Sequence, residues 1–204
     1  RRDLRLLDNQ ALHDALEQAE EVIPVFILDP KILDSPNASQ KRLAFLLDGL
    51  RCLDDDLRRR GSYLVMRHGN PSIELAGLVT ESGAGAIFAE PDVTPYALRR
   101  DGDISQRLPL SWCGSPAVRV PGTVLKPDGA PYTVCTPFSR AWKALPGLQA
   151  GGSFRAPERI QTPNGILTLP IPEQPRLPST APFKAGEGEA QRRLERFVGG
   201  DGIY

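Results

Sequence analysis

Residues 22–28 read VIPVFIL and run directly into Asp29 and Pro30. The run is apolar from end to end and has the length of a β-strand. A strand without alternating polar residues is typical of a parallel sheet that helices cover on both faces. Pro24 has no backbone N–H to donate, so we expect it near the start of the strand or at a bulge.

Helical patterns lie on both sides of this strand. Before it, Asn9 is a candidate N-cap for a helix over residues 10–20, whose apolar side chains form one stripe. After it, Ser39 is a candidate N-cap for a long helix over residues 40–60, which Gly61 would end. Leucines recur in this helix at spacings of three and four residues, which predicts a buried face. They are Leu43, Leu46, Leu47, Leu50, Leu53 and Leu57.

The same unit then repeats along the chain. Residues 63–67 and 86–89 have the pattern of further strands, and the Asn-Pro pair at residues 70–71 opens a helix between them. A weaker helical pattern around residues 96–108 leads into a further strand at residues 108–113. Helices and strands that alternate with short links predict a doubly wound, Rossmann-like α/β fold with a mostly parallel, five-stranded sheet.

Two segments break this alternation. The chain opens with the polar run RRDLR, residues 1–5, where a doubly wound sheet would have a strand. We therefore expect that a first strand is missing and that the sequence is the front part of a larger protein. Eight of the 20 prolines lie between residues 146 and 182, which predicts an extended linker over a surface. The expected divisions are an α/β domain at 1–145, the linker at 146–185, and a final segment at 186–204 with a short amphipathic helix.

Composition excludes several classes of protein. The 204 residues include 25 basic and 25 acidic side chains, and a net charge of zero argues against tight autonomous binding of nucleic acid. No apolar run approaches the roughly 18 residues of a membrane-spanning helix. Cys52, Cys113 and Cys135 are far apart, which argues against a disulfide framework or a zinc site and favours the cytoplasm. His13 lies in a helical pattern rich in acids, so we expect it to be solvated. No P-loop or nucleophile elbow occurs.

Polar and aromatic residues follow the predicted strands. In open α/β sheets, ligands bind beyond the carboxyl ends of the strands. The long helix would begin at that edge, and Arg42, four residues before Leu46, is expected on its inward-facing stripe. An arginine, an aspartate and a phenylalanine that converge there would suit a flat aromatic ligand with polar edges. Alternatively, Arg42 and Asp92 are rim charges that pair with each other. The candidate site residues are Arg2, Phe26, Leu28, Arg42, Asp92 and Thr94.

Several motifs together resemble the DNA photolyase/cryptochrome family. The opening RRDLRLxDNxAL, residues 1–12, resembles the opening motif of the family, which normally follows a short apolar strand. The segment PYTVCTPF, residues 131–138, together with Trp142, resembles the family's Y-x-V-F-T-P-F-x-x-x-W element. Further matches, in order and at compatible spacing, lie at residues 24–30, 42–46, 69–71 and 188–197.

The resemblance implies a function that the spacing alone does not. In this family an N-terminal α/β domain binds a light-harvesting antenna chromophore, and a C-terminal helical domain holds FAD and receives damaged DNA. Light energy reaches reduced FAD, which donates an electron to a cyclobutane pyrimidine dimer and splits it. The chain resembles the antenna domain of a deoxyribodipyrimidine photolyase. We expect it to be inactive alone, to partner the FAD domain of the same protein, and to self-associate through the exposed interdomain surface.

The resemblance also bears on the kind of antenna. Members that bind a folate have a histidine just before their N-x-S segment, and Pro36 stands in that place. Members that bind 8-hydroxy-5-deazaflavin, or FMN in the same cleft, have residues that match Arg2, Phe26, Leu28, Arg42 and Asp92. The deazaflavin is therefore favoured over FMN or a folate. The chain departs from the family pattern at Thr94, where a second acid is expected, and at Cys135, where a phenylalanine is usual.

Two other functions stay open on the sequence. A cryptochrome-type signalling or scaffold domain would have an empty antenna pocket, as Thr94 and the missing folate histidine suggest. A stand-alone nucleotide-binding α/β protein without photochemistry is the third. The sequence does not separate dimer repair, (6-4) repair and signalling, because their determinants belong to the second domain.

Overall fold

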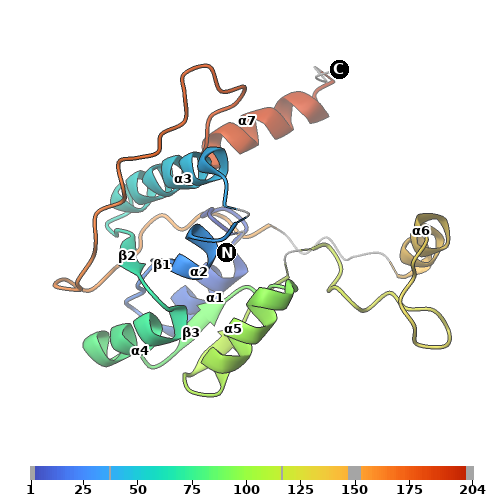
Figure 1. Ribbon diagram of the computed structural model, residues 1–204, viewed down its shortest axis with the longest axis horizontal. Helices are drawn as coiled ribbons and strands as arrows, with labels where there is room; N and C mark the ends of the chain where they lie inside the picture. The colour runs from blue at the N-terminus through green and yellow to red at the C-terminus, as the bar shows by residue number, and fades with distance from the viewer. Residues whose placement is uncertain (1–2, 37, 116, 147–152, 201–204) are drawn as a thin grey trace.

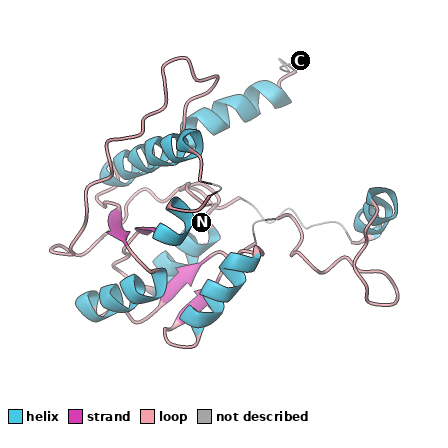
Figure 2. Ribbon diagram, viewed as in Figure 1, coloured by secondary structure: helices cyan, strands magenta, loops and turns pink. Residues whose placement is uncertain are grey.

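The computed structural model describes residues 3–36, 38–115, 117–146 and 153–200. Helices alternate with short strands over the first half of the chain, as predicted (Figures 1 and 2). The elements are α1 (Gln10–Gln18), β1 (Val25–Leu28), α2 (Pro30–Leu33), α3 (Gln40–Arg58), β2 (Val65–His68), α4 (Pro71–Ser82), β3 (Ile87–Ala89), α5 (Pro95–Ser105), β4 (Leu110–Trp112), α6 (Cys135–Ala144) and α7 (Glu187–Val198).

The strands form two separate parallel pairs. β1 pairs with β2, with Val25 opposite Val65, and β3 pairs with β4, with Ile87 opposite Leu110. The parallel direction confirms the predicted α/β class. A single five-stranded sheet, however, is not formed by the described residues, which contain these four strands in two sheets. Among these residues no backbone hydrogen bond joins β1 to β3. A cavity that both strands line separates the two ladders.

Local sequence signals place most helix ends correctly. The side chains of Asn9, Asn70 and Thr94 each accept a hydrogen bond from a backbone N–H in the first turn of the helix that follows, which satisfies one otherwise unpaired donor. Gly83 ends α4 in the left-handed conformation, with φ of 69°. Ser39 precedes α3 as predicted, but its side chain makes no capping hydrogen bond.

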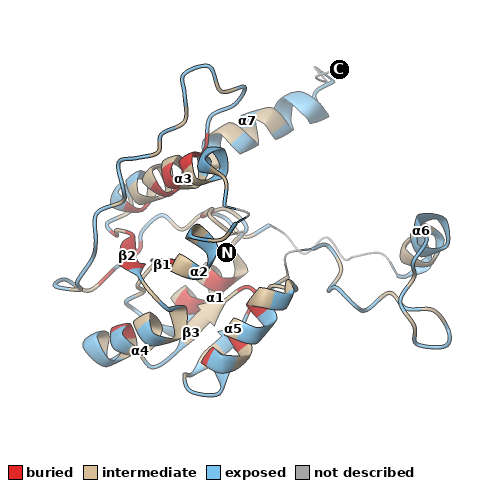
Figure 3. Ribbon diagram, viewed as in Figure 1, coloured by how far each residue is buried: buried red, intermediate tan, exposed pale blue. Residues whose placement is uncertain are grey.

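The core lies between α3 and the β1–β2 ladder. Leu47, Leu50 and Leu57 of α3 are at most 1% exposed, and they pack with Leu28 and Met66 of the two strands. Figure 3 shows this buried face of α3 and the buried strand β2. The spacing of three and four residues in α3 therefore does produce one buried stripe, as predicted.

Residues 153–185, called the strap below, form the described part of the proline-rich segment. The strap contains no helix or strand, in agreement with its proline content. It is nevertheless more than a surface linker, because Ile160 is 1% exposed and belongs to the core. Its backbone N–H groups donate to Arg60 (2.9 Å) and to Met66 (2.9 Å), so the strap covers the outer edge of β2.

Two helices were not predicted. α2 begins at Pro30, and Asp29 is its N-cap. A proline at the first helical position favours a helix start, but the sequence pattern placed these two residues at the end of the preceding strand. α6 carries Pro137 in its first turn, where a proline is tolerated, and none of its residues is buried. Figure 1 shows α6 apart from the other helices. Within this part of the chain, the Arg119 guanidinium lies 5.0 Å from the centre of the Trp142 ring.

The predicted final helix is present as α7 and begins beside the start of the chain. The Glu187 carboxylate accepts hydrogen bonds from the backbone N–H groups of Leu6 (2.7 Å) and Leu7 (2.9 Å). Farther along α7, Leu194 and Phe197 are 63% and 74% exposed. The start of α7 is therefore fixed to the α/β body, whereas its apolar stripe faces solvent.

The strap gives the first prediction. Replacing Ile160 by alanine should lower the free energy of unfolding by about 2 to 4 kcal/mol, because it opens a cavity in the core. Leu167→Ala, at a 63% exposed position of the same strap, should change it by less than about 0.5 kcal/mol. Urea denaturation followed by circular dichroism measures both. Equal effects of the two substitutions would show that the strap does not belong to the core.

Candidate functional site

The carboxyl ends of the two strand pairs are joined by a buried hydrogen bond. Asp29 follows β1 directly and is 5% exposed. One of its carboxylate oxygens accepts a hydrogen bond from the backbone N–H of Lys31 (3.0 Å). The other accepts a hydrogen bond from the hydroxyl of Tyr96, in the first turn of α5. Since α5 follows β3, this contact connects the carboxyl ends of β1 and β3 at one edge of the fold.

The environment of Tyr96 holds its proton firmly. Burial, together with the hydrogen bond to Asp29, raises the pKa of Tyr96 to about 12, although the nearby Arg100 acts in the opposite direction. The Arg100 guanidinium lies 5.8 Å from the centre of the Tyr96 ring and forms an ion pair with the buried Asp101 (2.7 Å). The hydroxyl therefore donates to Asp29 at every physiological pH.

Phe26 and Leu28 lie on β1 but in different surroundings. Phe26 is half-buried and lines a cavity of about 760 Å³ between the strand pairs. Leu28 is 6% exposed and packs into the core with α3. Of these two predicted contacts, only Phe26 borders open space.

Arg42 stands in the first turn of α3, as predicted, but it is exposed. The prediction that Arg42 lies on the inward-facing stripe of the helix is therefore wrong. The buried side chains of this helix are Ala44, Leu47 and Leu50, and because successive residues turn by about 100° around a helix, Arg42 lies away from that face. It remains at the end of α3 that adjoins the carboxyl edge.

Asp92 and Thr94 lie in the turn that starts α5. The Asp92 carboxylate accepts a hydrogen bond from the backbone N–H of Thr94 (3.0 Å), and the Thr94 hydroxyl accepts one from that of Ala97 (3.4 Å). Both side chains are half-buried. Their first role is to shape this turn, and a role in ligand binding stays a prediction. Arg2 lies outside the described residues.

Sequence reasoning missed Tyr96 and did not include Asp29 in the site. Asp29 had a usable signal, since it is the first residue after a buried strand. Tyr96 had none, because the partner of its hydroxyl lies 67 residues away in the chain.

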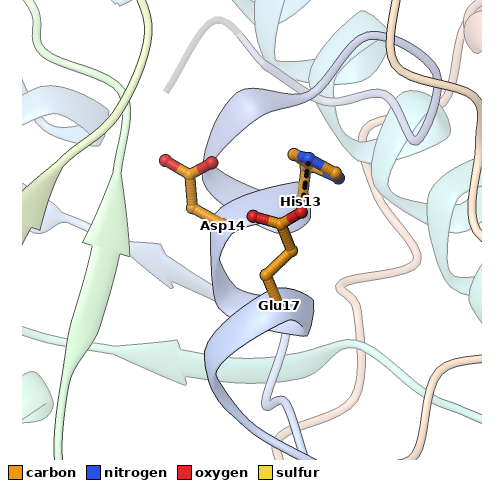
Figure 4. Close-up of side chains that lie close together, drawn as sticks. All are labelled: His13, Asp14 and Glu17. Atoms are coloured by element: carbon orange, nitrogen blue, oxygen red, sulfur yellow. Dashed lines mark ion pairs between the residues drawn. The ribbon is translucent and has the colours of Figure 1, made fainter.

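A second cluster of polar side chains lies on α1. The imidazole of His13 is 3.3 Å from the Glu17 carboxylate, and Asp14 is close by (Figure 4). Among the described residues this is the one grouping with potential metal ligands. His13 also stacks on Phe154, with ring centres 4.2 Å apart. A partly exposed i,i+4 pair on a solvated helix face accounts for this cluster.

Two of the three cysteines, Cys52 and Cys113, have thiols whose pKa is raised. Burial, and to a smaller extent a hydrogen bond to Asp14, raises the pKa of Cys113 to about 11. Burial and three nearby aspartates likewise raise the pKa of Cys52. Because the thiolate is the nucleophile, neither of these thiols is activated at neutral pH.

Comparison with known proteins identifies the family. The DNA photolyase family model matches residues 1–159, more than half of the chain. The chain belongs to the DNA photolyase family. A deoxyribodipyrimidine photo-lyase of Streptomyces griseus is 34% identical over 94% of the chain and 43% of its own length. A cryptochrome DASH of Natronomonas pharaonis is 29% identical over 97% of the chain and 45% of its own length.

A solved structure agrees with this photolyase-family fold. The crystal structure of a class III photolyase from Agrobacterium tumefaciens superposes with a TM-score of 0.84 and 25% identity, over 98% of the chain and 43% of that protein. The chain therefore spans less than half the length of each of these three proteins. Within the described residues, no helix combines the length and apolar composition needed to cross a membrane.

The contact between Asp29 and Tyr96 predicts how stability depends on pH. An unfolded tyrosine has a pKa of about 10, so the folded chain, where it is about 12, keeps the proton longer. The stability contributed by Tyr96 is full below pH 10 and is lost as the pH rises through 12. Tyr96→Phe should cost about 1 to 3 kcal/mol at pH 7 and make the alkaline loss of stability shallower. Urea midpoints between pH 7 and 11.5 measure both effects.

A matched control separates this contact from a general effect of lost hydroxyls. Tyr63 donates its hydroxyl to the carbonyl of Pro163 (2.8 Å), and Tyr63→Phe should keep the alkaline slope of the wild type. Cys113, whose raised pKa acts in the same direction, is present in all three proteins. An unchanged alkaline slope in Tyr96→Phe would contradict the assignment.

Proposed function

We propose that the chain is the antenna-chromophore domain of a photolyase, and that it holds a pigment whose excitation passes to FAD in a C-terminal helical domain. The observation that carries this proposal is the family match over residues 1–159. It is supported by relatives named deoxyribodipyrimidine photo-lyase, which extend well beyond the part that the chain covers. Repair of pyrimidine dimers in DNA is then an activity of the longer protein.

The residues at the carboxyl edge fit a flat ring with polar margins. Phe26 offers an aromatic face that is half-buried and borders open space, as stacking requires. Arg42 and Asp92 supply one positive and one negative group at the starts of α3 and α5 for hydrogen bonds to ring edges or ribityl oxygens. Energy transfer needs a fixed position of the pigment rather than an acid or a base.

The favoured pigment is 8-hydroxy-5-deazaflavin. Pro36 stands where folate-binding members have a histidine, which disfavours a folate. FMN shares the flat tricyclic shape and the ribityl chain, so it ranks second. When bound, either pigment would absorb blue or near-ultraviolet light and pass on the excitation.

We further propose a division at residues 145 and 185. The α/β domain would occupy 1–145, the proline-rich linker 146–185, which also contributes Ile160 to the core of that domain, and the lead into the FAD domain 186–204. The exposed apolar side chains of α7, including Leu194, Phe197 and Val198, would pack against that domain, which is the proposed partner. In its absence, the same surface would favour self-association.

The alternative function is a cryptochrome-type signalling or scaffold domain whose antenna pocket is empty. Two observations favour it. Asp92 and Thr94 already use hydrogen-bonding atoms within their own turn, and the relatives include proteins named cryptochrome DASH.

Titration with pigments distinguishes the two functions. The purified chain should bind the deazaflavin more tightly than FMN or a reduced folate, with a shifted blue absorption band and altered fluorescence. Substituting both Arg42 and Asp92 by alanine should weaken binding at least about tenfold, because two charge-assisted contacts are lost. Failure of a demonstrably folded chain to bind any of the three pigments would favour the scaffold domain.

The control variant removes two charges from the same helices outside the proposed site. Lys41→Ala combined with Asp103→Ala changes exposed residues of α3 and α5 and should leave the affinity for the deazaflavin unchanged. Equal losses in the two double variants would show that the pigment responds to overall charge, and the site as proposed would be wrong.

A further inference from the structure

The residues proposed for pigment binding belong to two different strand pairs. Phe26 lies on β1, and Arg42 lies at the start of α3, which packs on the β1–β2 ladder. Asp92 lies in the turn between β3 and α5. Among the described residues, no backbone hydrogen bond joins β1 to β3. A flat ring that contacts Phe26 and Asp92 together therefore needs another interaction to fix the separation between them.

The hydrogen bond from Tyr96 to Asp29 joins the two halves close to these residues. Asp29 comes three residues after Phe26, and Tyr96 comes four residues after Asp92. Asp29 is 5% exposed, and a buried carboxylate that loses a hydrogen bond is left partly unsatisfied, at a cost in free energy. The bond is therefore strongly favoured in the folded chain, and it holds the two strand ends together.

Each partner of this bond is also anchored within its own half of the fold. The second carboxylate oxygen of Asp29 accepts from the backbone N–H of Lys31 (3.0 Å), at the start of α2. On the other side, Ala97 follows Tyr96 directly, is 2% exposed, and donates its backbone N–H to the Thr94 hydroxyl (3.4 Å). A displacement of either partner is thus passed on to the start of α2 or to the turn that begins α5.

We propose that Tyr96 and Asp29 are a pair of positioning residues, which set the separation between Phe26 and Asp92 and so determine how tightly the pigment is held. Neither side chain of the pair has to touch the pigment. Its contribution is order, because groups that are already in place do not have to be ordered when the ligand binds. The inference rests on the proposed function and adds to it a determinant of affinity outside the residues that the sequence predicted.

Two variants break the bond in different ways. Tyr96→Phe removes the donor, and Asp29→Ser keeps a hydroxyl that can cap α2 but is too short to reach Tyr96. Each should weaken binding of 8-hydroxy-5-deazaflavin at least about fivefold and lower the fluorescence anisotropy of the bound pigment, because the ring is held less firmly. Asp29→Asn should restore most of the affinity that Asp29→Ser loses, since an amide can bond to both Lys31 and Tyr96.

Two controls separate the pair from a general loss of stability. Tyr63→Phe removes a hydroxyl that donates to the carbonyl of Pro163 (2.8 Å), at the opposite end of β2 from the carboxyl edge, and it should change the affinity by less than about twofold. The double variant Tyr96→Phe with Asp29→Ser should bind no more weakly than either single variant, because both substitutions break the same bond. Circular dichroism confirms that each variant is folded before it is titrated.

Hydrogen exchange tests the positioning role without any pigment. In Tyr96→Phe, the backbone amides of Lys31 and Ala97 should exchange at least about tenfold faster, because the starts of α2 and α5 open more often. The amide of Ser72, which donates to Asn70 (2.9 Å) at the start of α4, provides an internal control. Its exchange rate should stay as it is in the wild type.

The results distinguish a failure of this inference from a failure of the proposed function. If the wild-type chain binds none of the pigments, the proposed function fails, and the exchange rates of Lys31 and Ala97 decide the positioning role. If the wild type binds the deazaflavin and Tyr96→Phe binds it equally tightly, the positioning role is wrong while the proposed function stands. Additive losses in the double variant, or an equal loss in Tyr63→Phe, would also overturn the pair.

Discussion

The packing of α3 against the β1–β2 ladder is the interaction on which the remaining structure depends. Leu47, Leu50 and Leu57 are at most 1% exposed and bury the inner face of this ladder. The strap is held from the same unit, since its backbone donates to Arg60 just after α3 and to Met66 in β2. Burial of apolar surface is worth about 25 cal/mol per Å², and three of the most fully buried side chains come from this one helix. Within the described part of the chain, β1 pairs with β2 alone, and this packing covers the ladder that they form.

Local signals were enough to predict most of the elements, because each acts within a few residues. Asn9 and Asn70 cap their helices by bonding to N–H groups two or three residues on, and the leucine spacing of α3 is a property of a single helix. The strap shows where such reasoning ends. Proline content predicted its lack of regular structure, but Ile160 reaches the core through a contact with Arg60, 100 residues earlier in the chain. The prediction of a single sheet was not confirmed for a related reason. Whether two strands pair depends on what lies between them in the fold, and the sequence pattern of a strand does not contain this information.

The candidate site also contains some residues whose positions local patterns could predict and others whose contacts they could not. Phe26 borders the cavity and Arg42 stands in the first turn of α3, and their roles in ligand binding stay predictions. Sequence reasoning misjudged the side of α3 on which Arg42 lies, because four-residue spacing from Leu46 was a poor guide when Leu46 is itself only half-buried. The hydrogen bond between Asp29 and Tyr96 was beyond prediction, since it joins loops after two different ladders. That bond links the carboxyl ends of the two strand pairs, and burial together with this bond raises the pKa of Tyr96 to about 12.

Phe26 borders the cavity beside β1 and is also the aromatic group of the proposed pigment site. Its side chain is half-buried, so a ligand that stacks on the ring would bury it further. Any free energy needed to order the groups around this ring would oppose binding. By linkage, a ligand that binds there would in turn stabilise the ordered arrangement of β1. Ligand binding and the stability of the β1–β2 ladder are in this way coupled through a single side chain.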